Sequence, residues 1–240
     1  MTQPFIEPPL LFDDQWSVRA SPEEQVQVLP GDELIAQPID TLTHGITIRR
    51  PPRDVWAWLV QMGAGSRAGW YSYDWLDNGG RRSAERIEPA WQHPAVGSIF
   101  PALPGMTEGF VLLAVKEEKL LTLGMLGPDG RPEVTWGFVL REPVPGLTRL
   151  LVRARGGPGY RFHGLPLLLT RLVVRAVHFI MERKQLLEIK QRAELMPVRS
   201  TRAAHFPATN SNPRSSWPMP ELPSTIAPTL CALSKPIHVR

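Results

Sequence analysis

The feature that most constrains the fold of this chain is a succession of short strand patterns joined by short turns. Between residues 96 and 155, apolar or alternating runs recur at short intervals. Turn-forming residues separate these runs, as in Gly127-Pro128-Asp129-Gly130 and Pro145-Gly146. Because connections this short join antiparallel neighbours, the sequence predicts an antiparallel meander. The expected strands are Val96–Phe100, Gly109–Val115, Leu120–Met125, Val134–Arg141 and Thr148–Arg155.

Two of these strands indicate which face of the sheet is buried. Strand alternation places large apolar residues on one face of Val134–Arg141 and of Thr148–Arg155. These apolar positions are Val134, Trp136, Phe138 and Leu140 in the first strand and Leu150, Val152 and Ala154 in the second. The opposite face of the second strand presents Arg149, Arg153 and Arg155. We interpret this arginine row as solvated, with an anion site as the alternative.

Helical patterns lie on either side of the meander. A strand expected at Leu42–Arg49 is followed by a helix at Arg53–Met62. The longest element, Leu165–Leu195, is apolar nearly all round in its first half and spans about 45 Å as a helix, enough to cross a sheet. Its second half predicts a buried stripe of Leu186, Leu187 and Ile189 and a solvated side of Glu182, Lys184, Glu188 and Lys190. This order predicts an α+β fold with helices on one face of a curved antiparallel sheet.

Composition divides the chain into three parts. We expect an extended lead-in at residues 1–40, one folded domain at 41–196, and a disordered tail at 197–240, which is rich in proline, serine and threonine. The net charge of +4 resides in the tail, since acidic and basic residues balance before it. The apolar segment Leu165–Met181 is too short and too rich in arginine to predict a membrane span.

Several classes of function are disfavoured by composition and motifs. A charge-balanced body lacks the basic face that nucleic-acid binding requires. The single cysteine, Cys231, suits a reducing compartment, and the N-terminal residues lack a secretory signal, so we expect a cytoplasmic protein. The six histidines form no i,i+4 pair, and no Cys-x-x-Cys or phosphate-binding motif occurs. We therefore expect no metal and no cofactor, and the catalytic residues and the oligomeric state remain undetermined.

Aromatic residues are concentrated between Trp56 and Trp91. We interpret Trp56, Trp58 and Trp75 as core residues. The loop-like stretch with Trp70, Tyr71 and Tyr73 predicts the rim of an apolar pocket, since such rings combine an apolar body with a polar tip. Polar residues near them are expected to cap helices or close turns, or to act as acid or base if they face a cavity: Asp74, Asp77, Asn78, Gln92, His93 and Glu108.

A set of motifs in the folded part is similar to that of a known group of proteins. The motifs are LPGDELI at 29–35, the run at 46–78 that ends in GWYSYDWLDN, SAERIEPAWQ at 83–92, VGS at 96–98, WGFVL at 136–140, TRLLVRAR at 148–155 and MERKQLLEIKQRAE at 181–194. Together they resemble bacterial proteins of the SRPBCC superfamily, the START-like or helix-grip group. Its relatives include pollen-allergen-type proteins, polyketide cyclases and lipid-transfer domains.

The resemblance implies a helix-grip fold, in which a curved antiparallel sheet wraps around the long C-terminal helix and leaves an internal apolar cavity. The expected walls are Trp136, Phe138, Leu150 and Val152 from the sheet and Leu172, Ala176 and Ile180 from the helix, with Trp70, Tyr71 and Tyr73 at the rim. The implied function is binding of a small hydrophobic molecule such as a lipid or a polyketide-like metabolite. The alternatives are a cyclase or dehydratase that uses Tyr71, Tyr73, Asp74 or His93 as acid or base, and a non-catalytic interaction module.

Overall fold

The computed structural model describes residues 17–106, 109–158 and 167–197. The chain divides into two units, Met1–Val198 and Arg199–Arg240, and the described residues all lie in the first. Except for Pro197, the tail predicted to be disordered lies outside the described residues, as do residues 1–16 of the predicted lead-in. The helices are α1 (Pro22–Val26), α2 (Pro52–Val60), α3 (Asp74–Asp77) and α4 (Leu167–Leu195), with short 3-10 turns η1 (Asp32–Ile35) and η2 (Pro89–Trp91).

Six strands form one antiparallel sheet in the order β1-β6-β5-β4-β3-β2. The strands are β1 (Asp40–Ile48), β2 (Ile99–Pro101), β3 (Gly109–Lys116), β4 (Leu120–Leu126), β5 (Pro132–Val144) and β6 (Leu147–Gly156). The predicted meander is therefore confirmed, because β2 to β6 lie next to one another in chain order. The predicted strand at Val96 begins later, at Ile99, because Ser98 N–H donates to Ala95 O in a turn at 2.9 Å.

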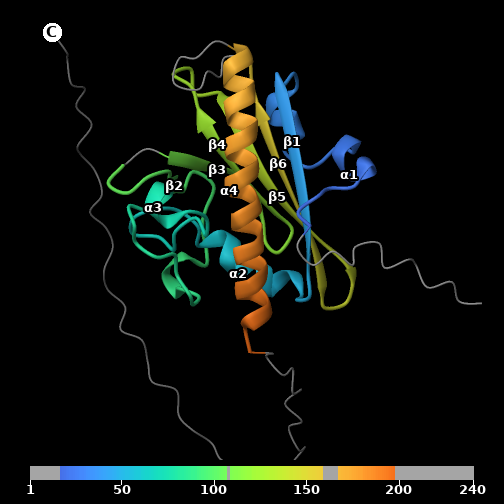
Figure 1. Ribbon diagram of the computed structural model, residues 1–240, viewed down its shortest axis with the longest axis vertical. Coiled ribbons are helices and arrows are strands. Elements are labelled where there is room, and N and C mark those ends of the chain that lie inside the picture. The colour runs from blue at the N-terminus through green and yellow to red at the C-terminus, as the bar shows by residue number, and fades with distance from the viewer. Residues whose placement is uncertain (1–16, 107–108, 159–166, 198–240) are drawn as a thin grey trace, which may run out of the picture. The chain divides into compact units, whose positions relative to one another are not determined.

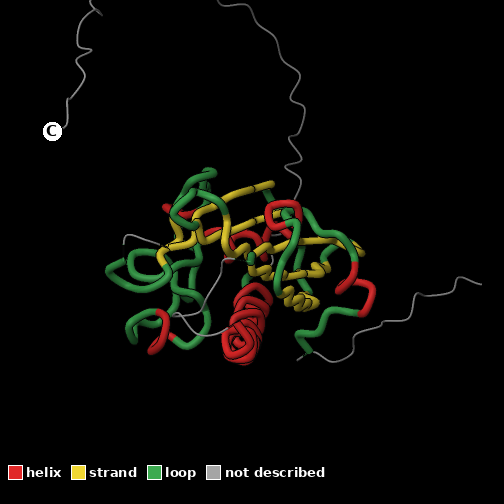
Figure 2. Tube along the Cα trace, turned by 90° about the horizontal axis from the view of Figure 1, so that it is seen from above, coloured by secondary structure: helices red, strands yellow, loops and turns green. Residues whose placement is uncertain are grey.

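Helix α4 covers one face of the sheet, which we call the inner face (Figures 1 and 2). It contacts β1 and also α2, which lies near its C-terminal half. This arrangement of a curved antiparallel sheet and a long C-terminal helix confirms the predicted helix-grip fold. Among the described residues, no helix combines the length and the apolar character needed to cross a membrane.

The C-terminal half of α4 is held by a stripe of buried side chains. Leu186, Ile189 and Ala193 are fully buried, and they pack with Val55 and Leu59 of α2 in the core beneath the sheet. The prediction that Glu182 and Lys190 are solvated is wrong, since both side chains are buried. Lys190 Nζ donates to Thr47 O at 2.8 Å and pairs with Glu194 at 2.6 Å, which explains how its charge is accommodated.

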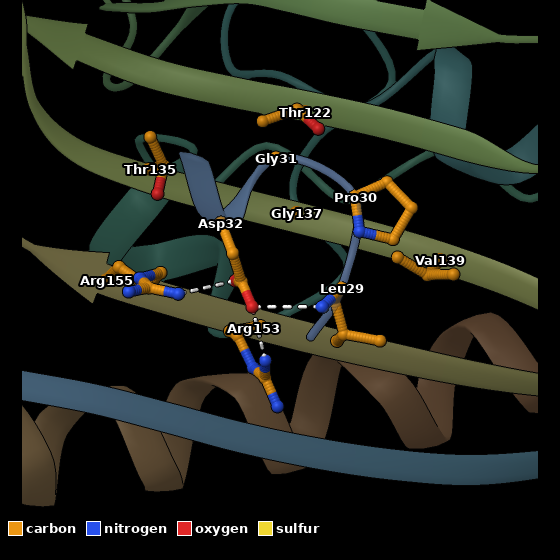
Figure 3. A pocket seen from close by; sticks show the side chains of 10 residues that line it. All are labelled: Leu29, Pro30, Gly31, Asp32, Thr122, Thr135, Gly137, Val139, Arg153 and Arg155. Atoms are coloured by element: carbon orange, nitrogen blue, oxygen red, sulfur yellow. Dashed lines mark hydrogen bonds and ion pairs between the residues drawn. The ribbon is translucent and has the colours of Figure 1, made fainter. Parts of the chain in front are cut away.

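The opposite face of the sheet, which we call the outer face, is covered by residues 17–36. Arg149 pairs with Glu24 at 2.6 Å, and Asp32 pairs with Arg153 at 2.7 Å and with Arg155 at 2.8 Å. Figure 3 shows the Asp32 carboxylate between both guanidinium groups and the Leu29 N–H. The interpretation of the arginine row as solvated is therefore wrong, because the lead-in supplies its carboxylates. Strand alternation correctly placed the three arginines on one face of the sheet. It did not show which segment of the chain covers that face.

A small pocket lies on this outer face beside Asp32 (Figure 3). Its volume is about 10 Å³, and its walls come from the Leu29–Asp32 turn and from the strands. A space of this size holds at most one water molecule. The pocket is therefore too small for the predicted ligand.

Candidate functional site

The interior between the sheet and α4 is filled to different degrees at its two ends. Near α2, Trp58, Leu59 and Met62 are almost completely buried. Farther along the inner face, Phe110 and Trp136 are only half-buried, although both pack against the same core. We call this second region the Trp136 end. Among the described residues, these two large side chains therefore keep some exposed surface on the inner face, unlike those near α2.

Aromatic rings cluster at the Trp136 end. Trp136 lies on the central strand β5, and its ring centroid is 5.6 Å from that of Trp70, 5.5 Å from that of Phe110 and 4.9 Å from that of Phe138. The Trp70 ring meets Phe110 edge-on, and its indole N–H donates to Ala102 O at 3.2 Å. The result is an aromatic cluster in which Trp70 and Phe138 are buried while Phe110 and Trp136 are partly exposed.

Three ionisable side chains border this aromatic cluster. His44 comes from β1, while His178 and Glu182 come from successive turns of α4. The imidazole rings of His44 and His178 are stacked, with centroids 5.9 Å apart, and the His178 ring meets Trp136 edge-on at 6.1 Å. His178 Nε2 lies 3.0 Å from Glu182 Oε2. Trp136 Nε1 donates to Glu182 Oε1 at 3.5 Å, so the aromatic and polar groups are in direct contact.

Burial leaves several polar atoms of this cluster unsatisfied. His44 Nδ1, His178 Nδ1 and Glu182 Oε2 are buried and form no well-directed hydrogen bond. Gln185 lies one turn beyond Glu182, where its Nε2 donates to Trp70 O at 2.9 Å while its Oε1 has no partner. An unpaired buried polar group costs about 1–3 kcal/mol, so these atoms need an explanation.

Burial also determines the charge state of the cluster. Desolvation raises the pKa of Glu182 to about 8, with the hydrogen bond from Trp136 opposing the shift. Desolvation, followed by the proximity of His44, lowers the pKa of His178 to about 4. The pKa of His44 is also lowered by desolvation. In the protein alone at neutral pH, the carboxyl group therefore keeps its proton and both imidazoles are neutral.

The four predicted wall residues of the sheet all lie on the inner face. Trp136 and Phe138 belong to the Trp136 end, with Val152 next to Phe138 in the sheet. Leu150 lies farther toward α2, opposite Leu140, and is completely buried in the core. The strand pattern was thus sufficient to identify the inner face, but it did not distinguish its half-open part from its packed part.

The predicted helix wall needs correction. Ala176 is exposed and Ile180 is 52% exposed, so neither side chain lines the interior. The side chain of Leu172 lies outside the described residues. The helix presents His178, Glu182 and Gln185 to the inner face instead. Because the first half of the helix is apolar nearly all round, the sequence pattern did not show which side of it faces the sheet. Polar residues of the second half such as Glu182 were wrongly expected to face solvent.

The three predicted rim residues have different surroundings. Trp70 is buried in the aromatic cluster. Tyr71 is buried in the core, where its hydroxyl accepts a hydrogen bond from Gln61 Nε2 at 2.8 Å. Tyr73 is half-buried, with Lys184 Nζ 5.6 Å from its ring centre. Of the predicted core tryptophans, Trp56 and Trp58 are buried, but Trp75 is 73% exposed, so that prediction is wrong.

The polar loop residues mostly close turns, as expected. Asp74 accepts hydrogen bonds from Ser83 N at 3.0 Å and Ser83 Oγ at 2.6 Å. Asn78 joins Gly65 N to Arg81 O. Asp77 is different, because both of its carboxylate oxygens are buried without a hydrogen-bond partner. Gln92 Nε2 donates to Ala57 O, His93 is exposed, and Glu108 lies outside the described residues.

The sequence did contain a signal for the missed cluster. His178 and Glu182 are four residues apart, and Gln185 follows at the next helical step. They share a stripe with Leu186, Ile189 and Ala193, which the helical period already assigns to the buried side. Extending that stripe backwards would have placed Glu182 inside. The contribution of His44 could not be found this way, since it depends on how β1 packs against α4.

Comparisons with known proteins give similarity in fold only. The sequence matches no protein-family model and no curated protein. Similar solved structures include a conserved protein of unknown function from Enterococcus faecalis, with 17% identity over 65% of this chain and 74% of that chain and a TM-score of 0.40.

Two other solved structures are similar to this chain. A polyketide_cyc-like protein from Corynebacterium glutamicum has 14% identity over 65% of this chain and 89% of that one, with a TM-score of 0.33. The Aha1 dimer from Colwellia psychrerythraea has 18% identity over 64% and 99%, with a TM-score of 0.32. The helix-grip assignment itself rests on the strand order and the position of α4.

Proposed function

We propose that this protein binds a small, mostly apolar molecule carrying one polar group, at the Trp136 end of its interior. One observation supports this proposal above all others: half-buried aromatic rings on the inner face lie directly beside buried polar atoms that form no well-directed hydrogen bond. An apolar ligand would cover the rings of Phe110 and Trp136. Its polar group would satisfy atoms of His44, His178 or Glu182.

Both parts of such a ligand would contribute to affinity. Each 100 Å² of apolar surface removed from water contributes about 2.5 kcal/mol. A hydroxyl or carbonyl group that pairs with a buried imidazole or carboxyl group adds about 1 kcal/mol and removes an existing desolvation penalty. The apolar part therefore supplies most of the affinity, while the polar group fixes the orientation. A ligand with no polar group would leave the penalty in place and bind less tightly.

The direct test is native mass spectrometry of the full chain purified from its host. We expect a co-purifying apolar molecule at a stoichiometry of up to one per chain, lost when Trp136 is replaced by leucine. Trp75→Leu is the matched control, because this tryptophan is exposed and far less packed. Repeated absence of any bound molecule, together with no response to a panel of fluorescent apolar probes, would contradict the proposal.

A second candidate function is catalysis of a proton transfer on the bound molecule. The observation that favours it is the 3.0 Å separation of His178 Nε2 and Glu182 Oε2, since two ionisable groups within hydrogen-bond reach can act as acid and base. The residues first considered for this role do not gather at the site: Tyr71 is in the core, Asp74 is bound to Ser83 and His93 is exposed. Chemical change of a bound ligand by wild type, but not by His178→Ala, would support catalysis.

A further inference from the structure

We propose that His44, His178 and Glu182 form a binding site for one divalent transition-metal ion of the zinc class. Each residue offers one ligand atom, and these atoms all lie within 4.8 Å of one another. A tetrahedral zinc ion with bonds of about 2.0–2.2 Å holds its ligand atoms about 3.3 Å apart. The three side chains therefore need only small rotations to reach a common ion.

The donor set suits this class of metal. Two imidazole nitrogens and one carboxylate oxygen are ligands that zinc accepts, whereas magnesium and calcium prefer oxygen ligands alone. Three protein ligands also leave a fourth position for water or for a polar group of a bound molecule. The side chain of His178 is 21% exposed, so part of the cluster is in contact with solvent.

The surroundings of the cluster support the same inference. Glu182 has a side chain only 1% exposed, and its Oε2 atom lies 3.0 Å from His178 Nε2 without a well-directed hydrogen bond, while the buried Nδ1 of each histidine forms no hydrogen bond. Trp136 Nε1 contacts the other oxygen, Oε1, and so leaves Oε2 available as a ligand. Hydrogen bonds from a neighbouring side chain to a ligand residue, like the one from Trp136, orient the ligands in known metal sites. A metal ion would give Glu182 and one nitrogen of each histidine a common partner without any change of fold.

The inference does not depend on the proposed binding of an apolar molecule, because metal binding can be measured without one. The experiment uses untagged, metal-free full-length protein titrated with Co²⁺ and followed by the visible absorption of tetrahedral cobalt. We expect one Co²⁺ per chain and displacement of that absorption by one equivalent of Zn²⁺. If no Co²⁺ binds, the proposed binding of an apolar molecule is unaffected and is tested separately by native mass spectrometry.

Two single variants and one control variant test whether the cluster holds the metal ion. Glu182→Gln keeps the shape of the side chain but removes its charge, and His44→Leu replaces a ligand by an apolar group that suits the buried face. Each is expected to weaken Co²⁺ binding at least tenfold and to lose the Zn²⁺-dependent rise in Tm that wild type should display. His93→Leu, which removes an exposed histidine, should bind like wild type.

Clear outcomes would overturn the inference. Wild type that binds no Co²⁺ with a Kd below about 100 μM would do so, given that functional zinc sites bind far more tightly. Binding that is unchanged in both Glu182→Gln and His44→Leu would show that other histidines hold the ion. The Tm of each metal-free variant shows whether it is folded. If His44→Leu is unfolded, Glu182→Gln alone decides the result.

Discussion

At the scale of single residues, two aspartates of the same short helix experience opposite environments. The carboxylate of Asp74 is held by the backbone and hydroxyl of Ser83. That of Asp77 is buried without a well-directed hydrogen bond, and the nearby Ser72 side chain and Asp77 backbone only partly offset its desolvation. Desolvation, followed by repulsion from Asp74, raises the pKa of Asp77 from 3.8 to about 6. The sequence placed both residues in a turn, but only the packing around α3 decides which carboxylate is satisfied.

This contrast predicts a pH-dependent effect of Asp77→Asn. Because the folded-state pKa exceeds the unfolded one, folding loses stability as pH rises from about 4 to 6 and the penalty persists at pH 7. The amide should therefore raise the free energy of unfolding by about 1–3 kcal/mol at pH 7.5 and have little effect below pH 4. Urea denaturation at both values measures this. Asp74→Asn, the matched control, should destabilise at pH 7.5 because it loses acceptor strength toward Ser83. A destabilising Asp77→Asn at pH 7.5 would refute the account.

At the scale of elements, the lead-in is a structural cover for the sheet. Residues 17–36 bring Glu24 and Asp32 to the outer face, where they neutralise Arg149, Arg153 and Arg155. Gly45 of β1 permits this approach, since a Cβ there would lie 2.6 Å from Arg149 Nη2. The sequence predicted the arginine row and the lead-in separately. The sequence did not show that the lead-in contacts the arginine row, because no local sequence pattern specifies which face of a sheet a distant segment covers.

The Asp32→Asn variant tests whether residues 17–36 stabilise the fold by covering the outer face of the sheet. Burial alone would raise the pKa of Asp32, but the Leu29 N–H and the two arginines lower it by more, so its net shift is downward. The ion pairs therefore stabilise the fold above about pH 4 and lose that effect as pH falls. We expect Asp32→Asn to cost about 2–4 kcal/mol at pH 7, shrinking in more acidic buffer. Asp129→Asn, at an exposed pair with Arg131, should change stability by less than about 0.5 kcal/mol. Equal effects of both variants in urea denaturation would contradict the assigned role.

Helix α4 allows a second test at this scale. Leu186 is completely buried between the sheet and α2, so Leu186→Ala should lower the free energy of unfolding by about 2–5 kcal/mol. Leu195 ends the same helix and is 75% exposed, so Leu195→Ala should change it by less than about 0.5 kcal/mol. Chemical denaturation of the two variants measures the difference. Similar changes in the free energy of unfolding for the two variants would mean that the C-terminal half of α4 is not packed against the sheet.

At the scale of the whole molecule, strand spacing and helix length were sufficient to predict the layout. Short turns forced neighbouring strands to pair, and a helix as long as α4 can bury its length only against the sheet. The candidate site was less accessible to prediction. Trp136 and Phe138 follow from strand alternation, but the cluster of His44, His178 and Glu182 requires the relative placement of β1 and α4.

The two ends of the interior differ in how completely their side chains are buried. The α2 end, with Leu59, Leu186 and Ile189, is packed as a core and stabilises the chain. The Trp136 end keeps half-buried rings and unpaired polar atoms, features that cost stability unless something binds there. The central claim is that this second end is a binding site for a small apolar molecule.

Titration with the neutral fluorescent probe N-phenyl-1-naphthylamine tests that claim most directly. The account predicts saturable binding of one probe per wild-type chain, at least tenfold weaker binding to Trp136→Leu, and binding within twofold of wild type for Trp75→Leu. Thermal unfolding of each variant would verify that it is folded. A folded Trp136→Leu protein that binds the probe as tightly as wild type, or a wild-type chain that does not bind it at all, would contradict the account.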